Sequence, residues 1–290
     1  MGKWLVGEDV GTAMHERIGA AMVRNGGSET GAPTPKSGAL ILNADDFGRD
    51  RPTTDRIAEC CATGAVSSVS AMVFMEDSER AAELAREQSI EVGLHLNFTA
   101  PFSGKSVPVP LAEHQERIAR HLRRHRLAQV VPHPGLIRSF QYVTKAQLDE
   151  FHRLYGFPAE RIDGHHHMHL CANVLLQKLL PRGTMVRRNF SFDRGEKSLG
   201  NTLYRNLVDR ALARRHWLTD YFFSLPPLEP VSRLEKIYTL ARQFTVEVET
   251  HPVNPDEYRY LAGGAFFRQI GDVRLARPSV VRARLERGLD

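Results

Sequence analysis

The stretch Ala39–Gly48, ALILNADDFG, decides the fold, because four apolar residues run directly into a polar cluster with two adjacent carboxylates. A short apolar run bounded by polar and Gly residues is typical of a strand buried on both faces, as in a parallel sheet. Six further strands are predicted at SVSAMVF, IEVGLHLNF, RIDGHH, TMVRRNF, DYFFSL and FTVEVET. Each is followed by loop or helix-like sequence, which predicts parallel strands in an α/β fold, laid out as an open sheet or closed into a barrel.

The composition predicts one folded domain preceded by an extension. The chain has 290 residues, of which 42% are hydrophobic and 25% charged, the balance of an ordinary globular protein. Residues up to about Ser37 end in GGSETGAPTPKSG, which has no periodic apolar pattern. We therefore expect a flexible N-terminal extension at residues 1–38 and a single domain at residues 39–290.

Charge and cysteine content narrow the class of protein. The formal net charge is +5, but the densest basic stretch, Arg117–Arg126, contains no aromatic residue that could stack on bases, so we expect no nucleic-acid partner. The three cysteines lack the even count of a disulfide framework. No apolar run approaches the roughly 18 residues of a transmembrane helix, and no signal peptide is evident. These features predict a cytoplasmic location, with a homodimer as an open alternative to a monomer.

The first two of four polar clusters contain Asp45, Asp46 and His95. Neighbouring strand residues point to opposite faces, so one of the two acids can bind a metal while the other stays free as a base. An Asp pair at such a place also commonly caps the following helix. His95 ends the strand IEVGLHL, and the alternation of side chains turns it away from its two Leu neighbours, into a barrel mouth or toward solvent.

The third cluster, DGHHHMHL at residues 163–170, is the strongest single signal in the chain. If the backbone stays extended, His165, His167 and His169 share one face at a spacing of roughly 6.6 Å. Metal–nitrogen distances of about 2.0 to 2.1 Å then allow one ligand here, with the other imidazoles as supporting or substrate contacts. The fourth cluster contains His251, which Pro252 confines to an extended conformation.

Together the clusters predict one pocket, because each lies at the C-terminal end of a different predicted strand. Two Asp residues plus His95 and one His of the tract give an Asp-His-His metal site with a spare carboxylate, which suits hydrolysis. In this hypothesis Asp45 takes a proton from water and a His delivers one to the leaving group. Two other functions stay open: a phosphoesterase with a second metal about 3.5 to 4 Å away, and a non-catalytic protein that binds sugar or metal.

The four motifs resemble those of a known family. NADDFG (Asn43–Gly48), GLHLNFT (Gly93–Thr99), DGHHHMHL (Asp163–Leu170) and ETHP (Glu249–Pro252) are similar, in order and spacing, to the motifs of the YdjC-like carbohydrate deacetylases, which include chitooligosaccharide deacetylases. The resemblance implies a distorted (β/α) barrel of about seven parallel strands. It also implies a metal-dependent hydrolase that removes N-acetyl groups from an N-acetylated amino sugar or oligosaccharide.

The resemblance implies a role for individual residues as well. Carried over by position, Asp46, His95 and His165 match the metal ligands, Asp45 matches the catalytic base, and His251 matches an acid or substrate contact. The implied cofactor is a divalent ion, Mg or Zn, with Mn or Co as alternatives.

The sequence departs from the family after NADDFG, where residues 49–52, Arg-Asp-Arg-Pro, replace the usual Leu-Ser and helix start. This charged rim would suit a lipid- or phosphate-bearing sugar as well as a neutral chitooligosaccharide.

Overall fold

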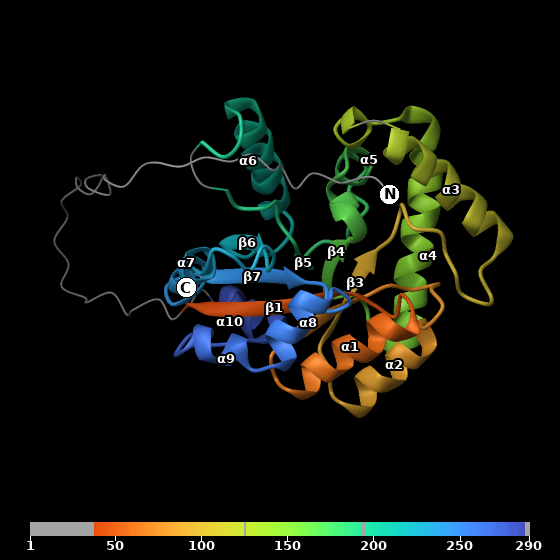
Figure 1. The fold of residues 1–290 in the computed structure, drawn as a ribbon. Coiled ribbons are helices and arrows are strands. Elements are labelled where there is room, and N and C mark those ends of the chain that lie inside the picture. The colour runs from red at the N-terminus through yellow and green to blue at the C-terminus, as the bar shows by residue number, and fades with distance from the viewer. Residues whose placement is uncertain (1–37, 125, 193–194, 288–290) are drawn as a thin grey trace. The chain divides into compact units, whose positions relative to one another are not determined.

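The computed structural model describes residues 38–124, 126–192 and 195–287. Within them, seven parallel strands form one sheet in the order β5-β4-β3-β2-β1-β7-β6 (Figure 1). The strands are β1 (Ala39–Phe47), β2 (Ser68–Ala71), β3 (Val92–Leu96), β4 (Arg161–Gly164), β5 (Met185–Val186), β6 (Tyr221–Ser224) and β7 (Thr245–Thr250). All seven predicted strands are confirmed. The predicted extension, residues 1–38, lies outside the described residues except for Gly38.

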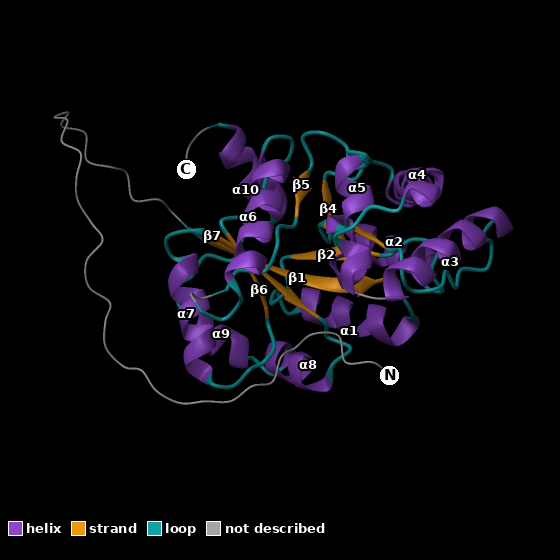
Figure 2. Ribbon diagram, turned by 90° about the horizontal axis from the view of Figure 1, so that it is seen from above, coloured by secondary structure: helices purple, strands orange, loops and turns teal. Residues whose placement is uncertain are grey.

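The sheet curls so that its two edges are joined by backbone hydrogen bonds. The N–H of Val186, in β5, donates to the Trp217 carbonyl at 2.9 Å, just before β6. Farther along, the N–H of Ser191 donates to the Phe222 carbonyl at 2.8 Å. Seen from above, the strands lie at the centre with helices around them (Figure 2). The distorted barrel of parallel strands is therefore confirmed.

Helices connect the successive strands and cover the sheet. They are α1 (Arg51–Ala62), α2 (Ser78–Glu87), α3 (Val109–Arg124), α4 (Ile137–Tyr155), α5 (Ala172–Leu176), α6 (Leu199–Ala213), α7 (Val231–Ala241), α8 (Pro255–Ala262), α9 (Ala265–Ile270) and α10 (Pro278–Glu286). Short 3-10 turns are η1 (Arg126–Gln129), η2 (Pro134–Leu136) and η3 (His165–Leu170). No helix among the described residues is long and apolar enough to cross a bilayer.

Three short helices follow β7, and the first of them, α8, carries a local start signal. The Asn254 side chain accepts a hydrogen bond from the Asp256 N–H at 3.0 Å, and Pro255 occupies the first helical turn. Asn at the cap and Pro directly after it are typical of a helix start.

Charged side chains fill part of the interior of the curled sheet. On β7 the two Val residues join the hydrophobic core, whereas Glu247 and Glu249 are buried on the opposite face. Arg161 Nη2 and Arg187 Nε each lie 2.6 Å from Glu247 Oε1. Buried charges are stable only when paired in this way. The resulting ion network is continuous with the polar residues at the C-terminal ends of the strands.

Candidate active site

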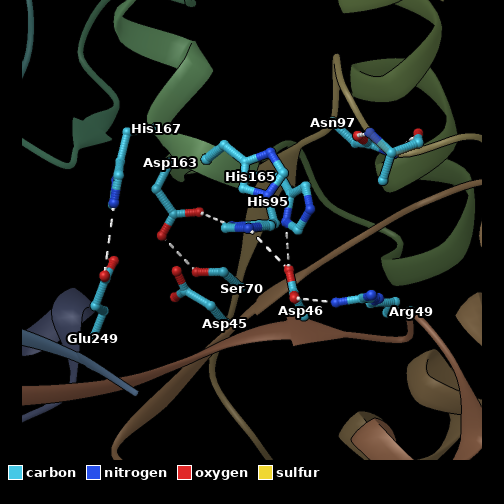
Figure 3. A network of polar contacts seen from close by, with 12 residues as sticks. Asp45, Asp46, Arg49, Ser70, His95, Asn97, Asp163, His165, His167 and Glu249 are labelled. Atoms are coloured by element: carbon cyan, nitrogen blue, oxygen red, sulfur yellow. Dashed lines mark hydrogen bonds and ion pairs between the residues drawn. The ribbon is translucent and has the colours of Figure 1, made fainter. Parts of the chain in front are cut away.

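Three of the predicted site residues meet at the C-terminal ends of β1, β3 and β4 (Figure 3). Asp46 Oδ1 lies 2.8 Å from His165 Nδ1 and 3.2 Å from His95 Nε2. All three side chains are buried. Their potential ligand atoms lie within 4.8 Å of one another, so a single cation could contact all three.

A bulge in β1 separates the two adjacent acids. Asp46 has a φ of +70°, a left-handed conformation that is costly for any residue with a Cβ, and the register of β1 against β2 shifts between Ala44 and Phe47. Asp45 stays on the face of Asn43, whose Nδ2 donates to it at 2.7 Å. As predicted, the side chains of Asp45 and Asp46 point in different directions. The cause is the bulge, however, and not the simple alternation of side chains along a strand.

Asp163 orients the imidazole of His95. His95 Nδ1 lies 2.7 Å from Asp163 Oδ1, and Asp163 Oδ2 accepts a hydrogen bond from Ser70 Oγ at 2.6 Å. A carboxylate that holds one ring N–H in this way leaves the other nitrogen available, here facing Asp46. Burial by itself lowers the pKa of His95, but the carboxylates of Asp45 and Asp163 outweigh it and raise the pKa to about 10. The carboxylates around His95 therefore favour positive charge at this place.

Arg187 holds the second acid, Asp45. Its guanidinium is fully buried and donates to both carboxylate oxygens of Asp45, at 2.6 and 2.7 Å. It also lies 2.9 Å from Asp163 Oδ2 and 3.1 Å from Glu249 Oε2. Burial by itself raises the pKa of Asp45, and the ion pair with Arg187 outweighs burial and lowers it. Asp45 therefore stays ionised.

The histidine tract does not keep the extended backbone that the sequence analysis assumed. It forms the turn η3, in which His166 and His167 have φ values of +54° and +57°. The imidazoles consequently point in different directions: His166 Nδ1 lies 2.9 Å from Thr99 Oγ1, His167 Nε2 lies 3.6 Å from Glu249 Oε1, and His169 Nε2 donates to the Arg187 carbonyl at 2.9 Å. The prediction that His165, His167 and His169 share one face is wrong. Among the described residues, His165 is the member of the tract that contacts Asp46.

His251 follows β7 directly, at the same edge of the sheet as the C-terminal end of β1. The pairing of β1 with β7 ends with Ala44 opposite Thr250, one residue before Asp45 on β1 and one residue before His251. The His251 backbone N–H donates to Glu257 Oε2 at 2.8 Å, and the residue is half-buried. His251 therefore lies at the edge of the sheet that carries the site, and it is not a member of the Asp46 cluster.

Comparison with known proteins agrees with this arrangement of motifs. A family model described as YdjC-like protein matches residues 39–272. The chain belongs to the YdjC-like family. One relative, a chitooligosaccharide deacetylase of Proteus mirabilis, is 29% identical over 268 residues, which cover 86% of this chain and 94% of that protein. A carbohydrate deacetylase of Brevibacillus brevis is 30% identical over 79% of this chain and 87% of its own length.

A solved structure of another protein shares the fold of this chain. It is that of a candidate cellobiose-phosphate cleavage protein from Enterococcus faecalis, which superposes with a TM-score of 0.53 at 18% sequence identity. The match covers 87% of this chain and 95% of that one. At this level of identity the similarity concerns the fold alone.

The residues of this YdjC-like chain fit the divalent metal that the resemblance implies. Asp46 offers a carboxylate oxygen, His95 and His165 offer imidazole nitrogens, and all three side chains are buried. Mixed oxygen and nitrogen donors of this kind accept Mg, Mn, Co or Zn with little discrimination. The carboxylate of Asp163 behind His95 is the supporting contact that such a ligand usually has.

Arg187 was not predicted as a site residue, although it contacts four carboxylates in or next to the site, those of Asp45, Asp163, Glu247 and Glu249. Arg187 lies in the predicted strand TMVRRNF, where two adjacent Arg residues after Met185 and Val186 are a weak signal. The segment FTVEVET contained a stronger signal of a buried cation. Glu247 and Glu249 occupy alternating positions of this strand, on either side of Val248. Two acids on the inner face of a buried strand require a cation from elsewhere in the chain.

Proposed function

We propose that the protein is a carbohydrate deacetylase that hydrolyses the N-acetyl amide of an amino sugar, using one divalent ion held by Asp46, His95 and His165. The observation that carries this proposal is the convergence of those three side chains within 4.8 Å, at the edge of the sheet where Asp45 and His251 also lie. The relatives from Proteus mirabilis and Brevibacillus brevis, both named as deacetylases, support the reaction type.

Each remaining residue has a task in this reaction. A divalent ion would polarise the amide carbonyl and lower the pKa of a water molecule. Asp45, oriented and kept ionised by Arg187, accepts the proton of the attacking water. His251 returns a proton to the departing amine, and Pro252 together with the hydrogen bond to Glu257 fixes its backbone. Asp163 keeps the His95 ring in the orientation that a ligand needs.

The position of Arg187 argues for a site with one metal ion. A two-metal phosphoesterase would need a second ion close to the first. Asp45, His95 and Asp163 form a second group close enough to bind an ion. However, Arg187 already donates to Asp45 and lies 2.9 Å from Asp163, so a cationic group occupies the position between these acids. A second divalent ion there would be repelled by the guanidinium.

The proposal extends to the ion, the substrate and the compartment. The ion is Mg²⁺ or Zn²⁺, with Mn²⁺ or Co²⁺ as substitutes, and the substrate is an N-acetylated sugar or oligosaccharide. The three cysteines are free thiols, which agrees with a reducing compartment such as the cytoplasm.

Acetate release from N-acetylglucosamine oligomers tests the proposal. The protein is stripped with a chelator and reloaded separately with Mg²⁺, Mn²⁺, Co²⁺ or Zn²⁺. We expect chelation to abolish release and at least one ion to restore it. Asp45→Asn should keep its bound metal yet lose about 10²–10⁴-fold in turnover, as for removal of a general base. Asp149→Asn, at an exposed acid on α4, is the matched control. Absence of acetate with every ion and every N-acetyl sugar tried would overturn the proposal.

A further inference from the structure

The N-terminal part of α6 exposes a row of apolar side chains to solvent. Leu199, Leu203 and Leu207 are 90%, 60% and 55% exposed. They are spaced by four residues, so they lie along one face of the helix. The helix packs on the rest of the described chain through the opposite face, which carries Val208 and Leu212. Figure 1 shows α6, in teal, projecting away from the sheet.

The same face becomes basic toward the end of the helix. Arg210 and Arg214 follow Leu207 by three and seven residues, which places them in line with the leucines, and both are exposed. Neither has an ion-pair partner among the described residues. Asp209, on the opposite face, is buried and lies 2.9 Å from Arg188 Nη2. The stripe formed by Leu199, Leu203, Leu207, Arg210 and Arg214, called the α6 face below, therefore contains no acidic residue.

An exposed aromatic ring lies beside the start of this helix. Phe192 is 41% exposed, with Lys197 Nζ at 4.7 Å and the Arg205 guanidinium at 5.0 Å from its ring centroid. Leu and Phe side chains flanked by Lys and Arg are typical of helices that lie in the boundary between lipid headgroups and acyl chains.

We infer that the α6 face docks on the surface of an anionic phospholipid bilayer. The leucines enter the boundary of the acyl chains, and Arg210 and Arg214 meet lipid phosphates. Charge argues against a second copy of the chain as the occupant, because pairing two α6 faces would bring the arginines of each copy against leucines and arginines of the other. The binding goes beyond the proposed deacetylase activity and does not depend on it.

The α6 helix is tied to the loop that enters the active site. Asp209 accepts hydrogen bonds from Arg188 Nη2 at 2.9 Å and from Asn189 Nδ2 at 2.8 Å, and both residues directly follow Arg187. A bilayer bound by α6 would therefore be held at a fixed distance and orientation from Asp45, the candidate base. Combined with the proposed function, this points to an N-acetylated sugar carried by a membrane lipid as a substrate.

Co-sedimentation with vesicles tests the inference. The full chain is mixed with vesicles of phosphatidylcholine alone or of phosphatidylcholine with phosphatidylglycerol. We expect binding to the anionic vesicles, weakened by salt because the charges are exposed. Leu203→Ser should weaken it by about tenfold or more through lost apolar burial, and Arg210→Gln by about fivefold. Val109→Ser is the matched control, since Val109 is 69% exposed on α3, far from α6 in Figure 1.

Three results would overturn the inference. One is a wild-type protein that does not sediment with the anionic vesicles. Another is a Leu203→Ser variant that binds them as tightly as the wild type. The third is a dimer in sedimentation velocity that Leu203→Ser dissociates, because the α6 face would then belong to a second copy. Acetate release is measured separately, so failure of vesicle binding and failure of the deacetylase proposal are distinguishable.

Discussion

Both carboxylate oxygens of Asp45 accept hydrogen bonds from Arg187, at 2.6 and 2.7 Å, although the two residues are 142 positions apart in the chain. The same guanidinium lies 2.9 Å from Asp163, whose other oxygen holds His95. One buried cation thus links the candidate base to the support of a candidate metal ligand. A substitution of Arg187 is therefore expected to disturb both Asp45 and Asp163.

Replacing Arg187 by Met should strongly destabilise the fold. The variant leaves the buried carboxylate of Asp45 without its guanidinium partner and leaves Asp163 and Glu247 with the guanidinium of Arg161 alone. Breaking a buried ion pair from one side costs about 3–5 kcal/mol. Urea unfolding measures the loss. Arg51→Met, at an exposed position, should change the unfolding free energy by about 0.5 kcal/mol or less. A similar small change for Arg187→Met would contradict the central role of this guanidinium.

His251→Ala should affect turnover and not metal content. Removing a general acid lowers kcat by about 10²–10⁴-fold, whereas His251 lies outside the group of potential ligand atoms around Asp46. Steady-state kinetics on an N-acetyl sugar and elemental analysis of the same sample separate the two effects. His114→Ala, at a partly exposed histidine of α3, serves as the control. Full turnover in His251→Ala would remove His251 from the reaction.

Acidification should destabilise the protein through His169. Burial lowers the pKa of His169 to about 4, below the roughly 6.5 of an unfolded histidine. The unfolded state therefore binds the proton first as the pH falls, so this contribution to stability is complete above about pH 6.5 and is lost between there and about pH 4, at up to about 1.4 kcal/mol per pH unit.

The His169→Gln variant isolates that contribution. Urea unfolding of wild type and variant is compared across this pH range, so that titration of the other groups cancels in the difference. The unfolding free energy of the variant should fall less steeply than that of the wild type. Identical slopes would show that His169 is not held neutral by burial.

The sequence contained enough to predict the strands and the convergence of the site, because both depend on local pattern. The apolar run before Asp45 and Asp46 indicates a buried parallel strand, and clusters after such strands meet at one edge by the geometry of the fold. The direction of each histidine in the tract could not be predicted in the same way. It depends on the left-handed backbone of His166 and His167. His is enriched in this conformation, but that preference does not tell which residues of a histidine tract adopt it.

Arg187 could not be assigned for a different reason. Its partners Asp45, Asp163 and Glu247 lie on three other strands, and only the curl of the sheet brings them around one side chain. A contact of this kind is a property of the tertiary fold, and the residues next to Arg187 in the sequence carry no trace of it.

Metal content per chain is the measurement that tests the central claim most directly. Purified wild type, Asp46→Asn, His95→Gln, His165→Gln and the exposed control Asp149→Asn are dialysed against the activating ion and analysed for bound metal. The account predicts one ion per chain in the wild type and the control, and a large loss in each of the other three variants. Two ions in the wild type, or a full ion retained when Asp46 or either histidine is replaced, would contradict it.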